Sequence, residues 1–217
     1  MKKCTLALVA AGLLSASLLS APVMAIPSDA MIDVYNQAAE GDKILVDVAH
    51  QSFEKHITEQ GVDPLSLVYL GSTQTLMGRD AWMPWNQMAH TEKGLATIAK
   101  GLDLLASCNT PLTEQQTRQG LPESYLARSI AASTFTSLPD LFNHFERGYD
   151  LFLELLAEEA FHQQSYEATA WVYFYAVQAA LRAQDMPQAK AWQEAMAQQD
   201  AQHPLTQQAK DLIESAA

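Results

Sequence analysis

Apolar residues recur every three or four positions along most of this chain, which is the period of an amphipathic α-helix. One such run contains Ile44, Val48, Phe53 and Ile57 and ends at Gly61. Glycine and proline divide the remaining sequence into similar runs, and no run shows the alternation typical of a β-strand. The pattern therefore predicts an all-α protein of roughly eight helices, arranged as an antiparallel array of helical hairpins joined by short turns.

For three segments the sequence predicts the local structure or burial more specifically. Residues 107–122 are polar and weakly periodic, which predicts a long loop. Tyr149 to Ala160 has one continuous apolar face and is expected to form a single helix. A later run has an aromatic face that we expect to be deeply buried. That face consists of Trp171, Phe174, Tyr175, Gln178 and Leu181.

The first twenty-five residues have the pattern of a secretory signal peptide. Lys2 and Lys3 precede an apolar run, and Val23 and Ala25 place small residues at the two positions that a signal peptidase requires. We expect cleavage after Ala25 and a periplasmic product, with residues 26–217 as a single helical domain. The apolar run is too short for a retained anchor, which needs about 20 residues.

Charge limits the classes of partner. The chain has 13 basic and 25 acidic residues, a formal net charge of −12. Removal of Lys2 and Lys3 with the signal leaves 11 basic residues against the same 25, a net charge of −14. Such a surface repels phosphate backbones and anionic lipids, so we expect neither nucleic-acid binding nor membrane insertion after cleavage.

Cysteine content excludes an internal disulfide in the predicted mature chain. Cys4 lies within the signal, where it is not at the cleavage point of a lipoprotein, and only Cys108 remains. We expect Cys108 to be a partly buried free thiol near a helix end, with pairing to another chain as the alternative.

Parts of the sequence resemble a degenerate tetratricopeptide repeat (TPR). Leu67-x-x-Leu70-Gly71 is similar to the first helix of that repeat, and the helix containing Gly94 and Gly101 is similar to the second. In such a pair, Gly71 would remove a side chain where the two helices approach closely. The spacing from Gly71 to Gly94 is about twice that of the repeat.

A second, more divergent unit resembles the same family near the C-terminus. It contains Trp171-x-x-Phe174 and Ala191-Trp192-x-x-Ala195, whereas Gln74 and Gln178 stand where the family has tyrosine. The resemblance implies a TPR-like superhelix that presents a concave surface of helix faces to a protein or peptide partner, without chemistry of its own. Neither a cofactor nor catalysis is expected from it.

The residues in excess of the repeat spacing include Arg79, Asp80, Trp82 and Trp85, our candidates for partner binding. Tryptophan and arginine are enriched at binding hot spots. In the alternative interpretation, both rings fill space inside the protein while Arg79 and Asp80 cap helix ends.

Glu159 and His162 raise a metal-binding alternative. This i, i+3 pair is the kind that helical di-iron proteins use, but those proteins need two such pairs and two further glutamates. The remaining histidines show no matching partner, so we expect Glu158, Glu159 and His162 to be solvated and no metal to be bound. The alternative function is a helical-bundle metalloprotein or enzyme using Glu159 and His162.

His144 and Glu146 lie close together after Leu138-Pro139, where we expect a surface polar cluster, with a pH-sensing or helix-capping role for His144 as the alternatives. The sequence lacks G-x-S-x-G, H-E-x-x-H and phosphate-binding glycine motifs. The sequence therefore favours a binding protein over an enzyme.

Overall fold

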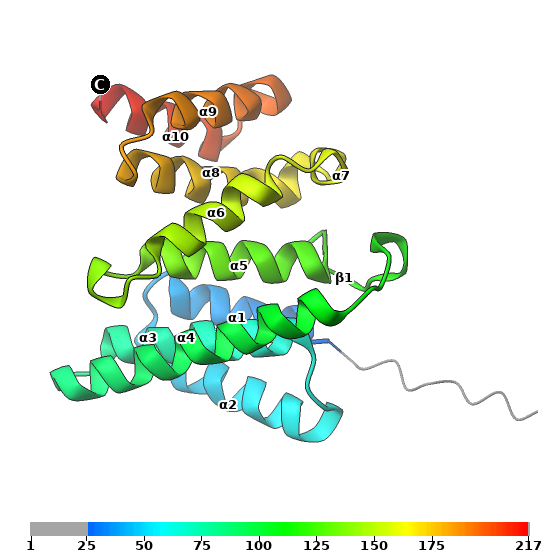
Figure 1. Ribbon diagram of the computed structural model, residues 1–217, viewed down its shortest axis with the longest axis vertical. Coiled ribbons are helices and arrows are strands. Elements are labelled where there is room, and N and C mark those ends of the chain that lie inside the picture. Colours follow the sequence, from blue (N-terminus) through cyan, green and yellow to red (C-terminus); the bar gives the residue numbers. More distant parts are fainter. Residues whose placement is uncertain (1–25, 217) are drawn as a thin grey trace, which may run out of the picture.

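The computed structural model describes residues 26–216 of the chain, and in this part ten α-helices hold most of the residues (Figure 1). The helices are α1 (Asp29–Ala39), α2 (Lys43–Gln60), α3 (Pro64–Asp80), α4 (Pro84–Ser107), α5 (Glu123–Ser137), α6 (Phe145–Leu155), α7 (Glu159–His162), α8 (Tyr166–Arg182), α9 (Met186–Asp200) and α10 (Pro204–Ala216). The all-α prediction is confirmed. The predicted signal peptide lies outside the described residues.

The helices stack along the long axis of the molecule, with α2 at one end and α9 and α10 at the other (Figure 1). Consecutive helices pack together as α3 with α4, α5 with α6, and α8 with α9. Contacts of α5 with α3 and with α8 join these pairs, while α1 lies on α2 and α3. Among the described helices, none combines the length and the hydrophobicity needed to cross a membrane.

Local sequence signals explain most helix ends. Asp42, Asp63 and Asp185 are the residues before α2, α3 and α9, and each side chain accepts a hydrogen bond from a backbone N–H of the first turn. Such caps satisfy donors that have no partner inside the helix. Gly61 ends α2 with a φ of 95°, a conformation that costs glycine little.

The predicted long loop, residues 107–122, contains short regular elements. These are the 3-10 turn η1 (Leu112–Glu114) and the strands β1 (Thr117–Arg118) and β2 (Leu121–Pro122). Arg118 donates from Nε to the Pro27 carbonyl at 2.6 Å, and the Gln119 N–H donates to Asp29 Oδ1 at 3.1 Å. The loop therefore holds the start of the described chain in place.

A continuous core connects the stacked helices. Phe53 of α2 stacks on Tyr69 of α3 with ring centroids 5.3 Å apart, and Tyr69 meets Tyr35 of α1 edge to face at 4.9 Å. Farther along the stack, Phe161 meets Tyr125 of α5 at 5.2 Å. Burial of these rings supplies the main driving force for association of the helices.

Helix number differs from the predicted eight for two reasons. The short helix α1 escaped prediction because its few buried positions, Ile32, Tyr35 and Ala38, are interspersed with polar residues. The helix expected over Tyr149 to Ala160 instead ends at Leu155, and the separate helix α7 follows. The bend lets Phe161 reach the core, where its side chain is fully buried.

Several burial predictions were wrong. Cys108 is exposed rather than partly buried, because it follows directly after the end of α4. Ile44 and Val48 of α2 face outward, with 81% and 45% of their surfaces exposed, whereas Val46, Ala49 and Phe53 are buried. The predicted apolar run therefore includes residues on both sides of α2, because Ala49 and Phe53 pack inward whereas Ile44 and Val48 do not.

The aromatic face of α8 is also not deeply buried. Tyr175 is 39% exposed, Gln178 is exposed, and Trp171 and Phe174 are partly exposed. Small residues occupy the buried face of this helix instead. They are Ala168, Thr169, Ala170, Val172, Ala176, Val177, Ala179 and Ala180, accompanied by Tyr173. Their small size lets neighbouring helices approach closely, which turns the large rings outward.

Candidate functional site

The predicted Arg79–Trp85 segment forms the end of the α3–α4 hairpin. This end projects to the left beyond the neighbouring helices in Figure 1. Trp82 is 85% exposed and Trp85 is 66% exposed, so the interpretation in which both rings fill internal space is wrong. Because α3 continues to Asp80 and α4 begins at Pro84, the two indoles lie at the end of this long hairpin.

Arg79 and Asp80 hold the base of this projection. Arg79 donates from Nε and Nη2 to the two carboxylate oxygens of Asp80, at 2.9 and 2.8 Å. Its guanidinium also donates to the carbonyls of Ala38 and Ala39 at the end of α1, at 3.1 and 3.2 Å. Hydrogen bonding by Arg79 lowers the pKa of the Asp80 carboxyl, and Lys43 lies 3.9 Å from the same group.

These contacts divide the predicted site residues by role. Arg79 caps the last turn of α1, as the alternative interpretation expected, and it fixes Asp80 at the same time. Their charged groups are engaged within the chain, whereas the indoles of Trp82 and Trp85 are available for contact. The structure thus brings all four residues to one end of the hairpin, where Trp82 and Trp85 are the most exposed of the four and the Arg79 side chain is 37% exposed.

Glycine packing brings the backbones of α3 and α4 into close contact. A Cβ atom added to Gly71 would lie 2.6 Å from the Gly94 carbonyl oxygen, and one added to Gly94 would lie 2.5 Å from the Gly71 carbonyl oxygen. Gly78 approaches Thr91 and Gly101 approaches Val68 in the same way. The expected close approach at Gly71 is therefore present, and it positions the connection that bears the tryptophans.

Apolar surface beside the hairpin end was missed in the sequence. The exposed Ile44 and Val48 lie near the start of α2, whose first residue Lys43 contacts Asp80. Their i, i+4 spacing is the available signal, because it puts two large apolar groups on one helix face. Clusters of exposed apolar residues mark interaction surfaces in many proteins.

Glu159 and His162 do not form a metal site with other residues. Both side chains are exposed, and His162 Nε2 lies 2.7 Å from the Leu156 carbonyl oxygen. Glu158 pairs with Arg128 of α5 at 2.5 Å and is partly buried rather than solvated. Within residues 26–216, no group of three or more His, Cys, Asp or Glu residues is arranged to hold a metal ion.

His144 lies between the 3-10 turn η2 (Asp140–Phe142) and α6. Its ring packs against Phe135 with centroids 5.1 Å apart, and burial together with the charge of Arg147 lowers the pKa of His144. Both effects favour the neutral form of the ring. Its surroundings are those of a structural contact between α5 and the start of α6.

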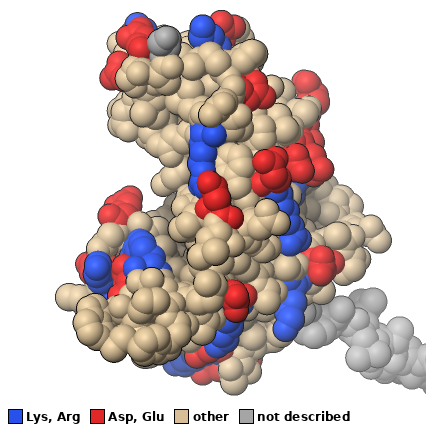
Figure 2. Space-filling model, turned by 60° about the vertical axis from the view of Figure 1, so that its left-hand side comes forward, with Lys and Arg blue, Asp and Glu red and all other residues tan. Residues whose placement is uncertain are grey.

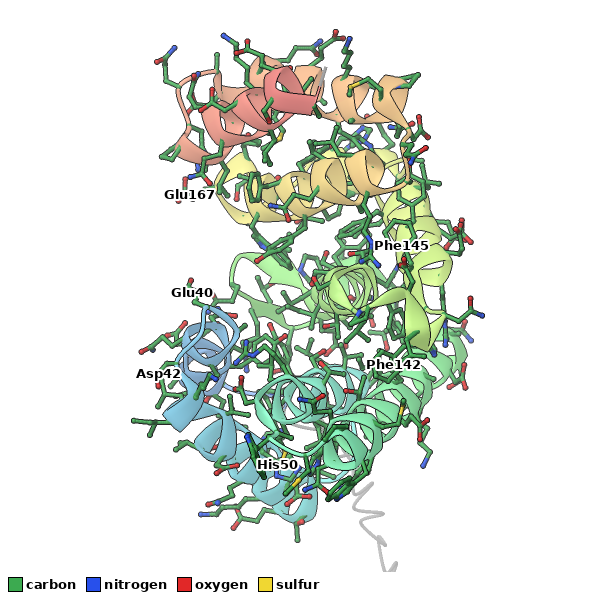
Figure 3. The ribbon with its side chains drawn as sticks, turned by 90° about the vertical axis from the view of Figure 1, so that its left-hand side faces the viewer. Glu40, Asp42, His50, Phe142, Phe145 and Glu167 are labelled. Carbon is green, nitrogen blue, oxygen red and sulfur yellow. The ribbon has the colours of Figure 1, made fainter. Side chains whose placement is uncertain are left out.

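A hollow between α1 and α8 was also missed in the sequence. Figure 2 shows it as an indentation between the two ends of the molecule, with walls made largely of uncharged residues. In Figure 3, Glu167 of α8 lies above it and Glu40 at the end of α1 lies below it. At the α5 end of the hollow is a small pocket of about 140 Å³, lined by Thr136, Ser137, Tyr175, Gln178, Ala179 and Arg182.

The hollow has an aromatic wall. The Tyr175 ring lies 6.2 Å from Trp171 and 6.0 Å from Phe174, each in an edge-to-face arrangement. Burial, with a smaller contribution from the negative charge of Glu40, raises the pKa of the Tyr175 phenol. The available sequence signal was the run of alanines on α8, which marks the buried side and thus leaves the aromatic side exposed.

Comparisons with protein-family models, with curated proteins and with solved structures gave no match to this chain. The geometry described above is therefore the basis for a functional proposal.

Proposed function

We propose that this chain is an exported, periplasmic helical-repeat protein of TPR-like architecture, which binds a protein or peptide partner and carries out no catalysis. Support for the architecture comes from the paired helices α3–α4 and α8–α9 and from the close approach at Gly71 and Gly94. Support for export comes from the signal-like pattern of residues 1–25.

The observation that carries the binding proposal is the exposure of Trp82 and Trp85 at the end of a closely packed hairpin. Indoles lose little conformational entropy on binding and offer a large contact area, which is why tryptophan is enriched at hot spots. The Arg79–Asp80 pair and the glycine contacts hold the connection before any partner arrives. Ile44 and Val48 add two exposed apolar side chains near the start of the neighbouring helix α2.

Site-specific photocrosslinking in the native host tests this proposal. A photoreactive residue replaces Trp82 in one strain, and the same residue replaces Gln198, an exposed position on α9, in a control strain. We expect a discrete adduct from position 82 that is absent from position 198. The adduct should weaken by at least about tenfold when Trp85→Ala is added, as for loss of a hot-spot residue.

The proposal fails if position 82 gives no discrete adduct, or if both positions give the same adducts. It also fails if Trp85→Ala leaves the adduct from position 82 unchanged. Circular dichroism of each purified variant confirms that the helices are intact, so that loss of the adduct is not loss of the fold.

A further inference from the structure

The hollow between α1 and α8 has features of a binding groove that are independent of the tryptophan hairpin. Its upper wall is one face of α8, where Glu167, Trp171, Tyr175 and Gln178 recur at the spacing of successive helical turns. All four side chains are exposed or partly exposed. A continuous helix face of this kind can contact several successive residues of a bound chain.

The lower wall has a carboxylate at its edge, because the exposed Glu40 follows directly after α1. The other acidic residues of α1, Asp29 and Asp33, accept hydrogen bonds from Gln119 and are engaged there. On the opposite wall, Glu167 is 90% exposed at its side chain. Figure 3 shows Glu40 and Glu167 on the same side of the molecule, at the two edges of the hollow.

The basic group at the α5 end of the hollow is already engaged. Arg182 donates from Nη1 to the Thr136 carbonyl at 2.5 Å and from Nη2 to the Asp140 carboxylate. Its guanidinium carbon also lies 4.6 Å from the centre of the Phe145 ring. These contacts hold Arg182 against α5 and α6, so its charge is balanced locally.

Aromatic rings between two carboxylates form a favourable environment for a cationic side chain. Lysine and arginine bind over the faces of tryptophan and tyrosine, and the attraction increases as water is excluded. The acidic net charge of the chain, −12, would also steer a basic partner toward this surface. An acidic or a purely apolar ligand would supply no positive charge to Glu40, nor to Glu167, whose carboxylate lies 3.8 Å from His203 Nε2.

We propose that this groove binds an extended, lysine- or arginine-bearing segment of a partner polypeptide. A basic side chain of that segment packs on Trp171 and Tyr175, and its charge lies between Glu40 and Glu167. The segment runs along α8, whose exposed face supplies successive contacts, and Gln178 offers a side-chain amide for hydrogen bonding with the peptide backbone.

Fluorescence anisotropy of the purified mature protein tests the proposal. The probes are a labelled peptide of alternating lysine and serine and a matched peptide of glutamate and serine. We expect saturable binding of the lysine peptide alone, with affinity that falls as salt rises, since ions screen exposed charges. Tyr175→Leu should weaken this binding by about tenfold, because it removes the π-face and keeps apolar volume.

Charge-neutralising variants separate the groove from the general acidity of the chain. Glu40→Gln and Glu167→Gln should each weaken binding by about threefold, the scale of an exposed ion pair. Asp211→Asn removes one exposed charge on α10, away from the groove, and should bind like the unmodified protein. Trp82→Ala should also bind like the unmodified protein, which separates this test from that of the hairpin.

Three results would overturn the proposal. One is the absence of saturable binding of the lysine peptide, and another is equal binding of the glutamate peptide. A third is an equal loss of affinity in Asp211→Asn and in the two glutamate variants. Sedimentation velocity supplies a further check, because a dimer that Tyr175→Leu converts to monomer would show that a second copy of the chain occupies the groove.

Discussion

The four tryptophans of this chain occupy very different environments. Trp82 and Trp85 are mostly exposed, Trp171 is partly exposed, and Trp192 is 6% exposed and meets Tyr149 edge to face at 6.0 Å. The neighbouring residues do not predict this order, because the most buried ring, Trp192, is followed by the polar pair Gln193-Glu194. Burial depends on which other helices cover each ring, and that is set by packing between distant segments.

Substitution of the most exposed tryptophan should therefore change stability far less than substitution of the most buried one. We expect Trp82→Ala to change the free energy of unfolding by less than about 0.5 kcal/mol, because the ring has little contact to lose. Trp192→Ala should lower it by about 3–5 kcal/mol, because it leaves a cavity between α9 and α6. Urea titrations of both variants measure this difference, and a large loss in Trp82→Ala would mean that its ring is covered in solution.

The role of a single residue could be predicted where one physical requirement determines the amino acid. Gly71 was expected to permit a close helix approach, and its neighbour across the interface is the Gly94 backbone. Asp63 and Pro64 mark the start of α3 through local signals, because an N-cap side chain and a first-turn proline depend only on adjoining residues. The exposure of Cys108 was missed, because it depends on contacts beyond the adjoining residues.

At the scale of elements, α3 and α4 show how packing overrides intrinsic helix preference. Glycine is the weaker helix former by about 1 kcal/mol relative to alanine, yet the hairpin has glycine at 71, 78, 94 and 101. In this chain an alanine at position 94 would meet backbone atoms, which cannot move without separating the two helices.

Gly94→Ala should accordingly destabilise the protein in spite of its better helix propensity. We expect the free energy of unfolding to fall by about 1–2 kcal/mol, because the cost of overpacking at the helix contact exceeds the gain from the higher helix propensity of alanine. Ala96→Gly, on the exposed face of α4, is the matched control. It should lower the free energy of unfolding by about 1 kcal/mol, because glycine has a lower helix propensity than alanine. Thermal unfolding of both variants checks the signs, and a stabilised Gly94→Ala would contradict the close packing.

Sequence reasoning found the α3–α4 hairpin end but not the groove. The Arg79–Trp85 stretch could be found because it interrupts a recognisable spacing. To predict the groove, one would have to know that α1 exists and which face of α8 is covered. The short apolar stripe of α1 was not detected in the sequence. A concave surface between non-adjacent helices follows from the stacking order, which no local pattern in the chain specifies.

At the scale of the whole molecule, the stacking encloses tyrosine hydroxyl groups as well as apolar side chains. Tyr35 and Tyr69 lie where α1, α2 and α3 meet, and Tyr69 is fully buried. Burial raises the pKa of Tyr35 to about 12 and raises the pKa of Tyr69 well above its ordinary value of 10. Both phenols therefore keep their protons in the folded protein at pH values where an unfolded chain loses them.

This difference makes stability depend on alkaline pH. Above pH 10 the unfolded state binds fewer protons than the folded state, so the free energy of unfolding falls as pH rises. Each of the two tyrosines should contribute a loss of about 1.4 kcal/mol per pH unit between pH 10 and 12. Urea titrations at pH 8, 10 and 11 measure the slope, and no loss above pH 10 would show that the rings are not buried.

Tyr69→Phe isolates one contribution to that slope. Within residues 26–216 the Tyr69 hydroxyl has no hydrogen-bond partner, so its removal should leave stability at pH 8 unchanged or slightly increased. The phenyl ring still stacks on Phe53. The loss of unfolding free energy above pH 10 should decrease by the contribution of one tyrosine. Tyr175→Phe, at a partly exposed ring in the groove, should reduce the slope much less, because its phenol is only partly desolvated.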